Sequence, residues 1–186
     1  MNLVHLLRVG KLESSLLENL CAAIPRSFSA SCRILPAEFD PAPHYHPERQ
    51  QYHSSEILEH IQPLMYQQAL PKHDGRLLAV TAVDLYIPIL KYVFGEALMG
   101  GPCAIVSLHR LRQEFYGLDP DASVLNARLL KECIHELGHT LNLAHCQDYR
   151  CAMASAHSVE WIDLRESRLC DSCRSRVESK SWRSGF

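Results

Sequence analysis

The segment HELGHTLNLAH, residues 135–145, contains three histidines and a glutamate at spacings that suit metal chemistry. His135 and His139 are four residues apart, so on a helix both imidazoles leave the same face and can reach one zinc ion. Glu136 stands beside the first histidine, where it is a poor ligand but can accept a proton from a zinc-bound water. The spacing therefore predicts a hydrolytic zinc site; a polar helix with incidental histidines is the alternative.

The third histidine of this segment requires the chain to turn. His145 lies ten residues after His135, so a continuous helix would carry it away from the metal. Asn142 tolerates the left-handed conformation that ends helices, and we expect it to end this helix and to swing His145 back. Three protein ligands leave a fourth position for water, which is typical of a catalytic zinc site.

Four of the eight cysteines form two closely spaced pairs near the end of the chain: Cys146, Cys151, Cys170 and Cys173. Such pairs, joined by a loop, are typical of a closed four-thiolate zinc site. We therefore expect two zinc ions per chain, one catalytic and one structural. A redox pair at C-x-x-C is the alternative, but it leaves the first two cysteines without a role. The other four stand alone and are expected to be small buried apolar residues: Cys21, Cys32, Cys103 and Cys133.

The pattern H-E-x-x-H-x-x-N-x-x-H-C-x4-C-x-M-x16-C-x-x-C, over residues 135–173, closely resembles the archaemetzincins, a branch of the metzincin zinc peptidases. The family often has glycine where this chain has Asn142, and its spacer after the methionine is one residue longer. The resemblance implies that Met153 forms a Met-turn, a hydrophobic support beneath the three histidines. It also implies an antiparallel edge strand along the cleft, by order residues 91–101, on which an extended peptide pairs. Gly95 would let the substrate chain approach closely or would form a bulge.

Strands and helices alternate in the first part of the chain. We expect a strand at 2–9, a helix at 12–23 and a second strand that starts at Cys32 and ends at Pro36. Residues 40–55 are rich in proline and histidine and predict a loop. Its histidines are expected to be solvated, and a metal or gating site is the alternative: His44, His46 and His53.

The segments that follow lead up to the histidine-containing helix. Ser54 or Ser55 is expected to cap a helix whose apolar face runs from Ile57 to Met65, and residues 71–76 predict a turn. Three strands are expected at 77–88, 91–100 and 102–111, with a tight turn at Gly100–Gly101 between the last two. Asp121 or Ser123 caps a helix over 123–142, whose predicted inward stripe is Leu130, Ile134, Leu137 and Leu141.

These elements predict an α/β (α+β) fold with a mixed, mostly parallel twisted sheet and a long active-site helix. The resemblance implies that residues 1–186 form one metallopeptidase domain with a metzincin-like upper lobe. Residues 1–142 would be the N-terminal lobe, with the sheet and the active-site helix. Residues 143–186 would be a small C-terminal lobe, with the Met-turn and the four-cysteine zinc site.

Composition narrows the function further. The 186 residues are 47% hydrophobic and 22% charged, with a net charge of −2 and no basic stripe, so we expect no nucleic-acid partner. The sequence has no long apolar segment and no signal-peptide pattern, so we expect no membrane partner and a cytoplasmic location. Oligomeric state is not indicated.

The leading hypothesis is a zinc-dependent peptidase that hydrolyses peptide bonds in peptide or protein substrates by a zinc-bound water activated by Glu136. A binding protein that keeps the metal for architecture is a second hypothesis. A third is a zinc-ribbon-like nucleic-acid module built on the cysteine pairs. The third hypothesis draws on nearby basic residues, which acidic residues dilute: Arg165, Arg168, Arg174, Arg176, Lys180 and Arg183.

Overall fold

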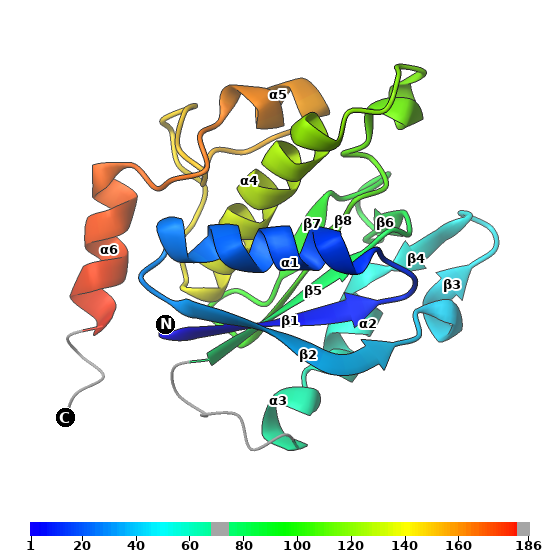
Figure 1. The fold of residues 1–186 in the computed structure, drawn as a ribbon, viewed down its shortest axis with the longest axis horizontal. Helices are drawn as coiled ribbons and strands as arrows, with labels where there is room; N and C mark the ends of the chain where they lie inside the picture. Colours follow the sequence, from blue (N-terminus) through cyan, green and yellow to red (C-terminus); the bar gives the residue numbers. More distant parts are fainter. Residues whose placement is uncertain (68–74, 182–186) are drawn as a thin grey trace.

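A five-stranded sheet in the order β2-β1-β5-β8-β7 is the centre of the protein (Figure 1). The computed structural model describes residues 1–67 and 75–181. Four strands pair in parallel: β1 (Leu3–Val9), β2 (Ser31–Phe39), β5 (Gly75–Thr81) and β8 (Cys103–Ser107). The edge strand β7 (Gly95–Ala97) runs antiparallel to β8. This mixed, mostly parallel sheet confirms the predicted fold class.

Helices cover both faces of the sheet, so its central strands are apolar on both sides. On one face lie α1 (Ser14–Ala23) and α4 (Ala122–Thr140), and on the other lies α2 (Ser54–Ile61) (Figure 1). Successive residues of a strand point to opposite faces. Accordingly, Leu6 packs in the core beneath α1 and α4, while Leu7 packs in the core beneath α2.

The sequence predicts that the second strand ends at Pro36. In the structure β2 continues to Phe39. Its pairing with β1 shifts register there, because Leu6 pairs with Ile34 but Arg8 pairs with Glu38. Proline has no backbone N–H, so it is tolerated at such a bulge and on an edge strand, and β2 is the edge of this sheet.

The prediction for the isolated cysteines was wrong for two of the four. Cys21 on α1 and Cys32 on β2 form a disulfide with a Cα–Cα distance of 5.3 Å. Cys103 and Cys133 are fully buried free thiols, as expected. The pairing could not be read from the sequence because it depends on how α1 packs beside β2.

Residues 40–55 are not the loop that the sequence predicts. They contain a short helix, η2 (Ala42–His44), and the strands β3 (Tyr45–His46) and β4 (Gln51–His53), which form a small sheet with β6 (Leu85–Tyr86). Strands of two or three residues are too short to show a periodicity in the sequence.

The histidines of this segment are therefore not simply solvated. His44 is buried, and its Nδ1 lies 3.4 Å from Glu56 Oε2, while His46 Nε2 lies 3.5 Å from the same oxygen. His53, and not a serine, caps α2, because its Nδ1 accepts from Glu56 N at 3.3 Å. Among the described residues, two clusters hold at least three ligand atoms within 4.8 Å of one another, and these histidines belong to neither.

Other predicted elements differ in their boundaries. The helix expected after residue 54 breaks after Ile61 near Pro63, and a separate α3 (Leu64–Gln67) follows. The turn at 71–76 lies largely outside the described residues. The strand predicted at 77–88 is divided between β5 and β6, and only Gly95–Ala97 of 91–100 form a strand. Two short helices complete this part of the chain: η1 (Ile24–Arg26) and η3 (Gln113–Tyr116).

The helix α4 begins as the sequence predicts. Asp121 caps it by accepting hydrogen bonds from Ser123 N (2.8 Å) and Val124 N (3.1 Å). Its buried face is wider than the predicted stripe, because the helix is covered by α1 and α5 as well as by the sheet. Leu129 and Cys133 are buried, while Leu130 and Leu141 are only partly buried.

The C-terminal part of the chain packs on the α4 side of the sheet, with α5 (Val159–Leu164) and α6 (Asp171–Ser181) following one another along the molecule (Figure 1). Met153, Ile162 and Leu169 join the same apolar core as Leu137 of α4. In the part of the chain that the structure describes, no helix has the length and apolar character that crossing a bilayer requires.

Candidate metal centre

The helix α4 ends in the turn that the sequence predicts. Asn142 adopts a φ of +61°, in the left-handed region. Its N–H donates to the carbonyl of His139 at 2.8 Å, and the N–H of Leu143 donates to the carbonyl of Gly138 at 3.0 Å. These two bonds define a Schellman motif, which reverses the chain after the helix. The Gly100 N–H, in the β7–β8 turn, also donates to the His139 carbonyl, at 2.9 Å.

This reversal brings the three predicted histidines together. One nitrogen from each of His135, His139 and His145 lies within 4.8 Å of the others. Their ring centroids are separated by 4.6 Å, 5.0 Å and 5.3 Å. His135 is buried and His145 is exposed, so the group faces solvent on one side.

The hydrogen bonds of two of the rings show that the group fits a cation. The Nδ1 atoms of His135 and His139 lie 2.8 Å from the carbonyls of Ala152 and Leu143, to which they donate. Each Nε2 is then left with a lone pair, and the two Nε2 atoms are 3.0 Å apart. Facing lone pairs repel unless a cation lies between them. Two Zn–N bonds of about 2.0–2.1 Å in a tetrahedron put the nitrogens about 3.4 Å apart, so the donor set fits zinc.

The pKa values of these imidazoles are lowered, which favours the neutral form that binds metals. Burial lowers the pKa of His135 well below its usual value, and the nearby Arg165 guanidinium lowers it further. Burial also lowers the pKa of His139 and of His145.

Met153 is fully buried and packs on the helix that carries two of the histidines; its predicted support of the three rings stays a prediction. A Cβ atom added at Gly138 would overlap the Met153 sulfur. Glycine at this position therefore lets the thioether pack directly on the backbone of α4, one residue before His139.

The carboxylate of Glu136 is buried between α4 and β7. A Cβ atom added at Gly95 would lie 2.7 Å from Glu136 Cγ and 2.9 Å from its Oε1. Gly95 is thus required for close approach of Glu136; the predicted approach of a substrate chain at this residue stays a prediction. Burial, and then the Glu132 carboxylate, raise the pKa of Glu136 well above its usual value, which favours a proton acceptor that works near neutral pH.

A cleft of about 570 Å³ runs between β7 and the histidines. Glu136 and the three histidines line it on one side, and β7 with the loop before it lines the other. Several of its side chains are apolar, and Leu90 and Met99 are exposed at 51% and 56%. The cleft therefore combines an unpaired strand edge with apolar contacts next to the metal ligands.

Replacing Gly95 by alanine is expected to impair the site more than the fold. The new methyl group would press on Glu136 and on the carbonyl of Ile105, 2.8 Å away, at a cost of about 1–3 kcal/mol in unfolding free energy. Because Glu136 must move, peptide turnover should fall more than the stability loss explains. Gly117→Ala is the control, since that turn glycine has open space and a φ of +76°. Equal turnover in the two variants at matched folded fraction would contradict this expectation.

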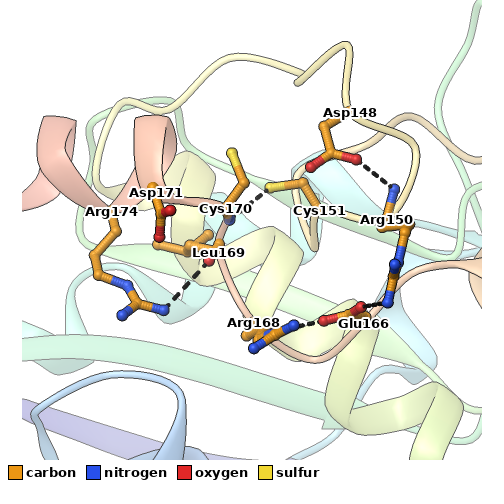
Figure 2. A pocket seen from close by; sticks show the side chains of 9 residues that line it. All are labelled: Asp148, Arg150, Cys151, Glu166, Arg168, Leu169, Cys170, Asp171 and Arg174. Carbon is orange, nitrogen blue, oxygen red and sulfur yellow. Dashed lines mark hydrogen bonds and ion pairs between the residues drawn. The ribbon is translucent and has the colours of Figure 1, made fainter.

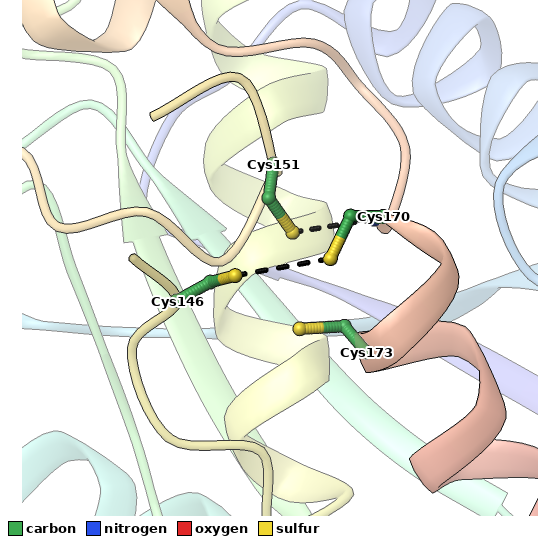
Figure 3. Close-up of side chains that lie close together, drawn as sticks. All are labelled: Cys146, Cys151, Cys170 and Cys173. Carbon is green, nitrogen blue, oxygen red and sulfur yellow. Dashed lines mark hydrogen bonds between the residues drawn. The ribbon is translucent and has the colours of Figure 1, made fainter. Parts of the chain in front are cut away.

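The four paired cysteines form a second cluster (Figure 3). Cys146 and Cys151 come from the loop after α4, and Cys170 and Cys173 from the start of α6, with all four sulfurs pointing inward. The sulfurs of Cys146 and Cys170 are 3.8 Å apart. Four Zn–S bonds of about 2.3 Å in a tetrahedron give about 3.8 Å between sulfurs, so the cluster fits zinc.

The two clusters are joined through the backbone. Cys146 directly follows His145, and its N–H donates to the carbonyl of Met153 at 2.9 Å. The loop that carries the third histidine therefore joins the cysteine cluster at Cys146 and is bonded there to Met153.

Ion pairs account for several of the basic residues near the cysteines. Beside Cys151 and Cys170, a cavity is lined by Arg150 and Arg168, which both pair with Glu166 (Figure 2). Arg165 is buried and pairs with Glu132. Of the basic residues named for the nucleic-acid hypothesis, Arg165 and Arg168 are thus paired with glutamates.

Sequence reasoning missed two groups near the site. Glu132 and Arg165 form a buried ion pair that lines the cleft behind His135. Glu96 on β7 accepts hydrogen bonds from the hydroxyls of Ser54 and Ser55 at the start of α2. The signal for Glu132 was available, because it lies three residues before His135 on a largely buried helix and must have a cationic partner.

Comparisons with known proteins identify relatives of this chain. The sequence model of peptidase family M54 matches residues 43–179. An archaemetzincin of Methanocaldococcus jannaschii is 42% identical over 149 residues, which are 80% of this chain and 78% of the relative. One from Archaeoglobus fulgidus is 32% identical over 164 residues, which are 88% and 92% of the two chains.

Solved structures show the same fold. A zinc-dependent peptidase from Methanocorpusculum labreanum superposes with a TM-score of 0.85 at 28% identity, over 94% of this chain and 99% of that one. The archaemetzincin of Archaeoglobus fulgidus superposes with a TM-score of 0.77 at 31% identity, over 94% and 99%.

The fold and the three-histidine site, with these relatives, define a zinc metallopeptidase, a hydrolase that acts on peptides or proteins. The chain belongs to peptidase family M54, together with the archaemetzincins.

Proposed function

We propose that His135, His139 and His145 hold a catalytic zinc ion and that Glu136 is the general base for peptide-bond hydrolysis. The main support is the pair of Nε2 atoms 3.0 Å apart whose rings donate their Nδ1 protons elsewhere. The exposure of His145 leaves one side of the group open to a substrate.

In the proposed mechanism the metal ligands and Glu136 have different roles. Zinc held there supplies a Lewis acid, which acidifies water and polarises the peptide carbonyl. Glu136 takes the proton of the attacking water and returns it to the leaving amine. Its buried position, with the raised pKa, makes it a stronger base than an exposed glutamate once it is ionised. The hydrogen bonds from Nδ1 to carbonyls hold two of the rings in place.

We propose that the substrate binds as an extended peptide along β7. Within residues 1–67 and 75–181, this strand pairs with β8 alone and is the last strand of its sheet. Its free edge faces the cleft, and backbone pairing there would supply affinity without regard to sequence. Apolar contacts with Leu90 and Met99 would then favour apolar side chains in the peptide.

We also propose a second, structural zinc ion bound by Cys146, Cys151, Cys170 and Cys173, which makes two ions per chain. The spacing of the sulfurs supports this proposal. Four thiolates leave no open position, so this ion would brace the fold and take no part in the chemistry.

A peptide library incubated with the zinc-loaded protein tests the function. Cleavage that disappears after chelation and returns on adding zinc is the expected result. The fragments, read by mass spectrometry, would show which bonds are cut. No cleavage by protein that elemental analysis shows to be fully loaded would favour a binding protein instead.

A further inference from the structure

A buried ion pair lies directly behind the metal ligands. Arg165, the residue directly after α5, donates from Nη2 to a carboxylate oxygen of Glu132 on α4. Arg165 is 2% exposed and Glu132 is 3% exposed. Removing two charges from water is unfavourable, and a buried ion pair is often no more stabilising than two apolar side chains. Fold stability alone therefore gives little reason for this pair.

The same guanidinium also holds the turn around Met153. Its Nη1 donates to the carbonyl of Ala154 at 3.0 Å and to that of Ala152 at 3.2 Å. These two carbonyls flank Met153. Through one planar group, Arg165 thus connects the turn around Met153 to Glu132 of α4. A lysine ammonium could not make this fork of contacts.

One of these carbonyls, that of Ala152, also contacts the proposed zinc ligand His135. The Ala152 carbonyl accepts the Nδ1 proton of His135 at 2.8 Å. Arg165 Nη1 lies 2.9 Å from that same Nδ1. Nη1 has two protons, and when both are donated to these carbonyls, Nδ1 of His135 keeps its own proton and the lone pair stays on Nε2. The orientation and the tautomer of His135 therefore both depend on Arg165.

We propose that Arg165, neutralised by Glu132, is a positioning residue that fixes the ring plane and the Nδ1-protonated tautomer of His135. This inference rests on the proposed role of His135 as a zinc ligand. Arg165 is buried and its guanidinium lies against His135, so we expect it to act through this histidine. Groups that orient a ligand in this way commonly change metal affinity or activity by about 10–100-fold when they are removed.

Three variants and one control test the proposal. Arg165→Met removes the guanidinium, and Arg165→Lys keeps the charge but not the fork. Arg165→Met combined with Glu132→Leu removes both charges, so that no carboxylate is left buried and unpaired. The control is Arg128→Met, because Arg128 is also a largely buried arginine, which joins α4 to α5 through Asp163 at 2.7 Å but does not contact His135.

The measurements are zinc affinity, by competition with a chromophoric chelator, and the His135 tautomer in the zinc-free protein, by ¹⁵N NMR. We expect the double variant to regain the thermal stability lost in Arg165→Met. It should still bind the catalytic zinc about 10–100-fold more weakly and show mixed tautomers. In peptide cleavage, kcat should fall while KM changes little. Arg165→Lys should resemble Arg165→Met in tautomer, and Arg128→Met should lose stability alone.

Wild-type zinc affinity and a single Nδ1 tautomer in the double variant would overturn the proposal, as would an equal loss of zinc affinity in Arg128→Met. Zinc affinity and tautomer are measured without substrate, so these results do not depend on hydrolysis. If the wild-type protein bound zinc at the histidines but cleaved no peptide, the proposed function would fail while the role of Arg165 could still be decided.

Discussion

Replacing Glu136 by glutamine is expected to lower kcat/KM for peptide cleavage by roughly 10²–10⁴-fold while the protein keeps its zinc. Glutamine has nearly the same shape, so it should fit against Gly95, but it cannot accept the proton of the attacking water. Glu136 lies outside the group of three histidines, so metal binding should be unchanged. Elemental analysis and steady-state kinetics on the same sample measure both quantities.

Glu160→Gln is a suitable control, because this glutamate is exposed on α5. It should change neither zinc content nor turnover. Full activity in the Glu136 variant would refute the proposed mechanism. Loss of zinc from that variant would instead assign Glu136 a part in holding the metal.

Replacing Cys170 by serine is expected to remove one zinc ion per chain and to weaken retention of the other. Serine is a poor zinc ligand, so the four-thiolate site should lose its metal. The loop from Cys146 to Met153 then loses one of its two anchors, and His145 stands next to Cys146 in that loop. We expect the catalytic zinc to bind about 10–100-fold more weakly, as is common when a supporting group is lost.

Two measurements test this coupling between the cysteine and histidine sites. The first is the zinc content per chain before and after dialysis against a weak chelator, and the second is the melting temperature. Cys103→Ala is the matched control: Cys103 is a fully buried free thiol on β8 and belongs to neither cluster of ligands. It should lower stability and leave both zinc ions bound. One zinc ion fewer with normal cleavage activity in the Cys170 variant would show that the two sites are independent.

Much of this site could be predicted from the sequence because its ligands are local. His135 and His139 share one helix face, and the turn at Asn142 needs only a residue that tolerates positive φ. Cap chemistry at Asp121 is local in the same way. The two cysteines of each pair are close in sequence, so the four sulfurs come together as soon as the two segments that carry the pairs meet.

The features that the sequence did not reveal depend on contacts between distant segments. Arg165 follows a short helix and resembles a surface residue until α5 places it against Glu132, 33 residues earlier. Pro36 reads as the end of a strand, but an edge position and a bulge accommodate it. The strands β3, β4 and β6 have two or three residues each, and pairing with one another is what defines them.

The turn between β7 and β8 also closes the last turn of α4, through the bond from Gly100 to the His139 carbonyl. For directed evolution, this bond makes the hairpin a poor place for insertions. A longer loop, chosen to broaden the range of peptides accepted, would withdraw the donor from His139 and loosen a ligand at the same time. Libraries that vary residues 87–92, in the loop before β7 that also lines the cleft, leave that bond intact and are the better starting point for new selectivity.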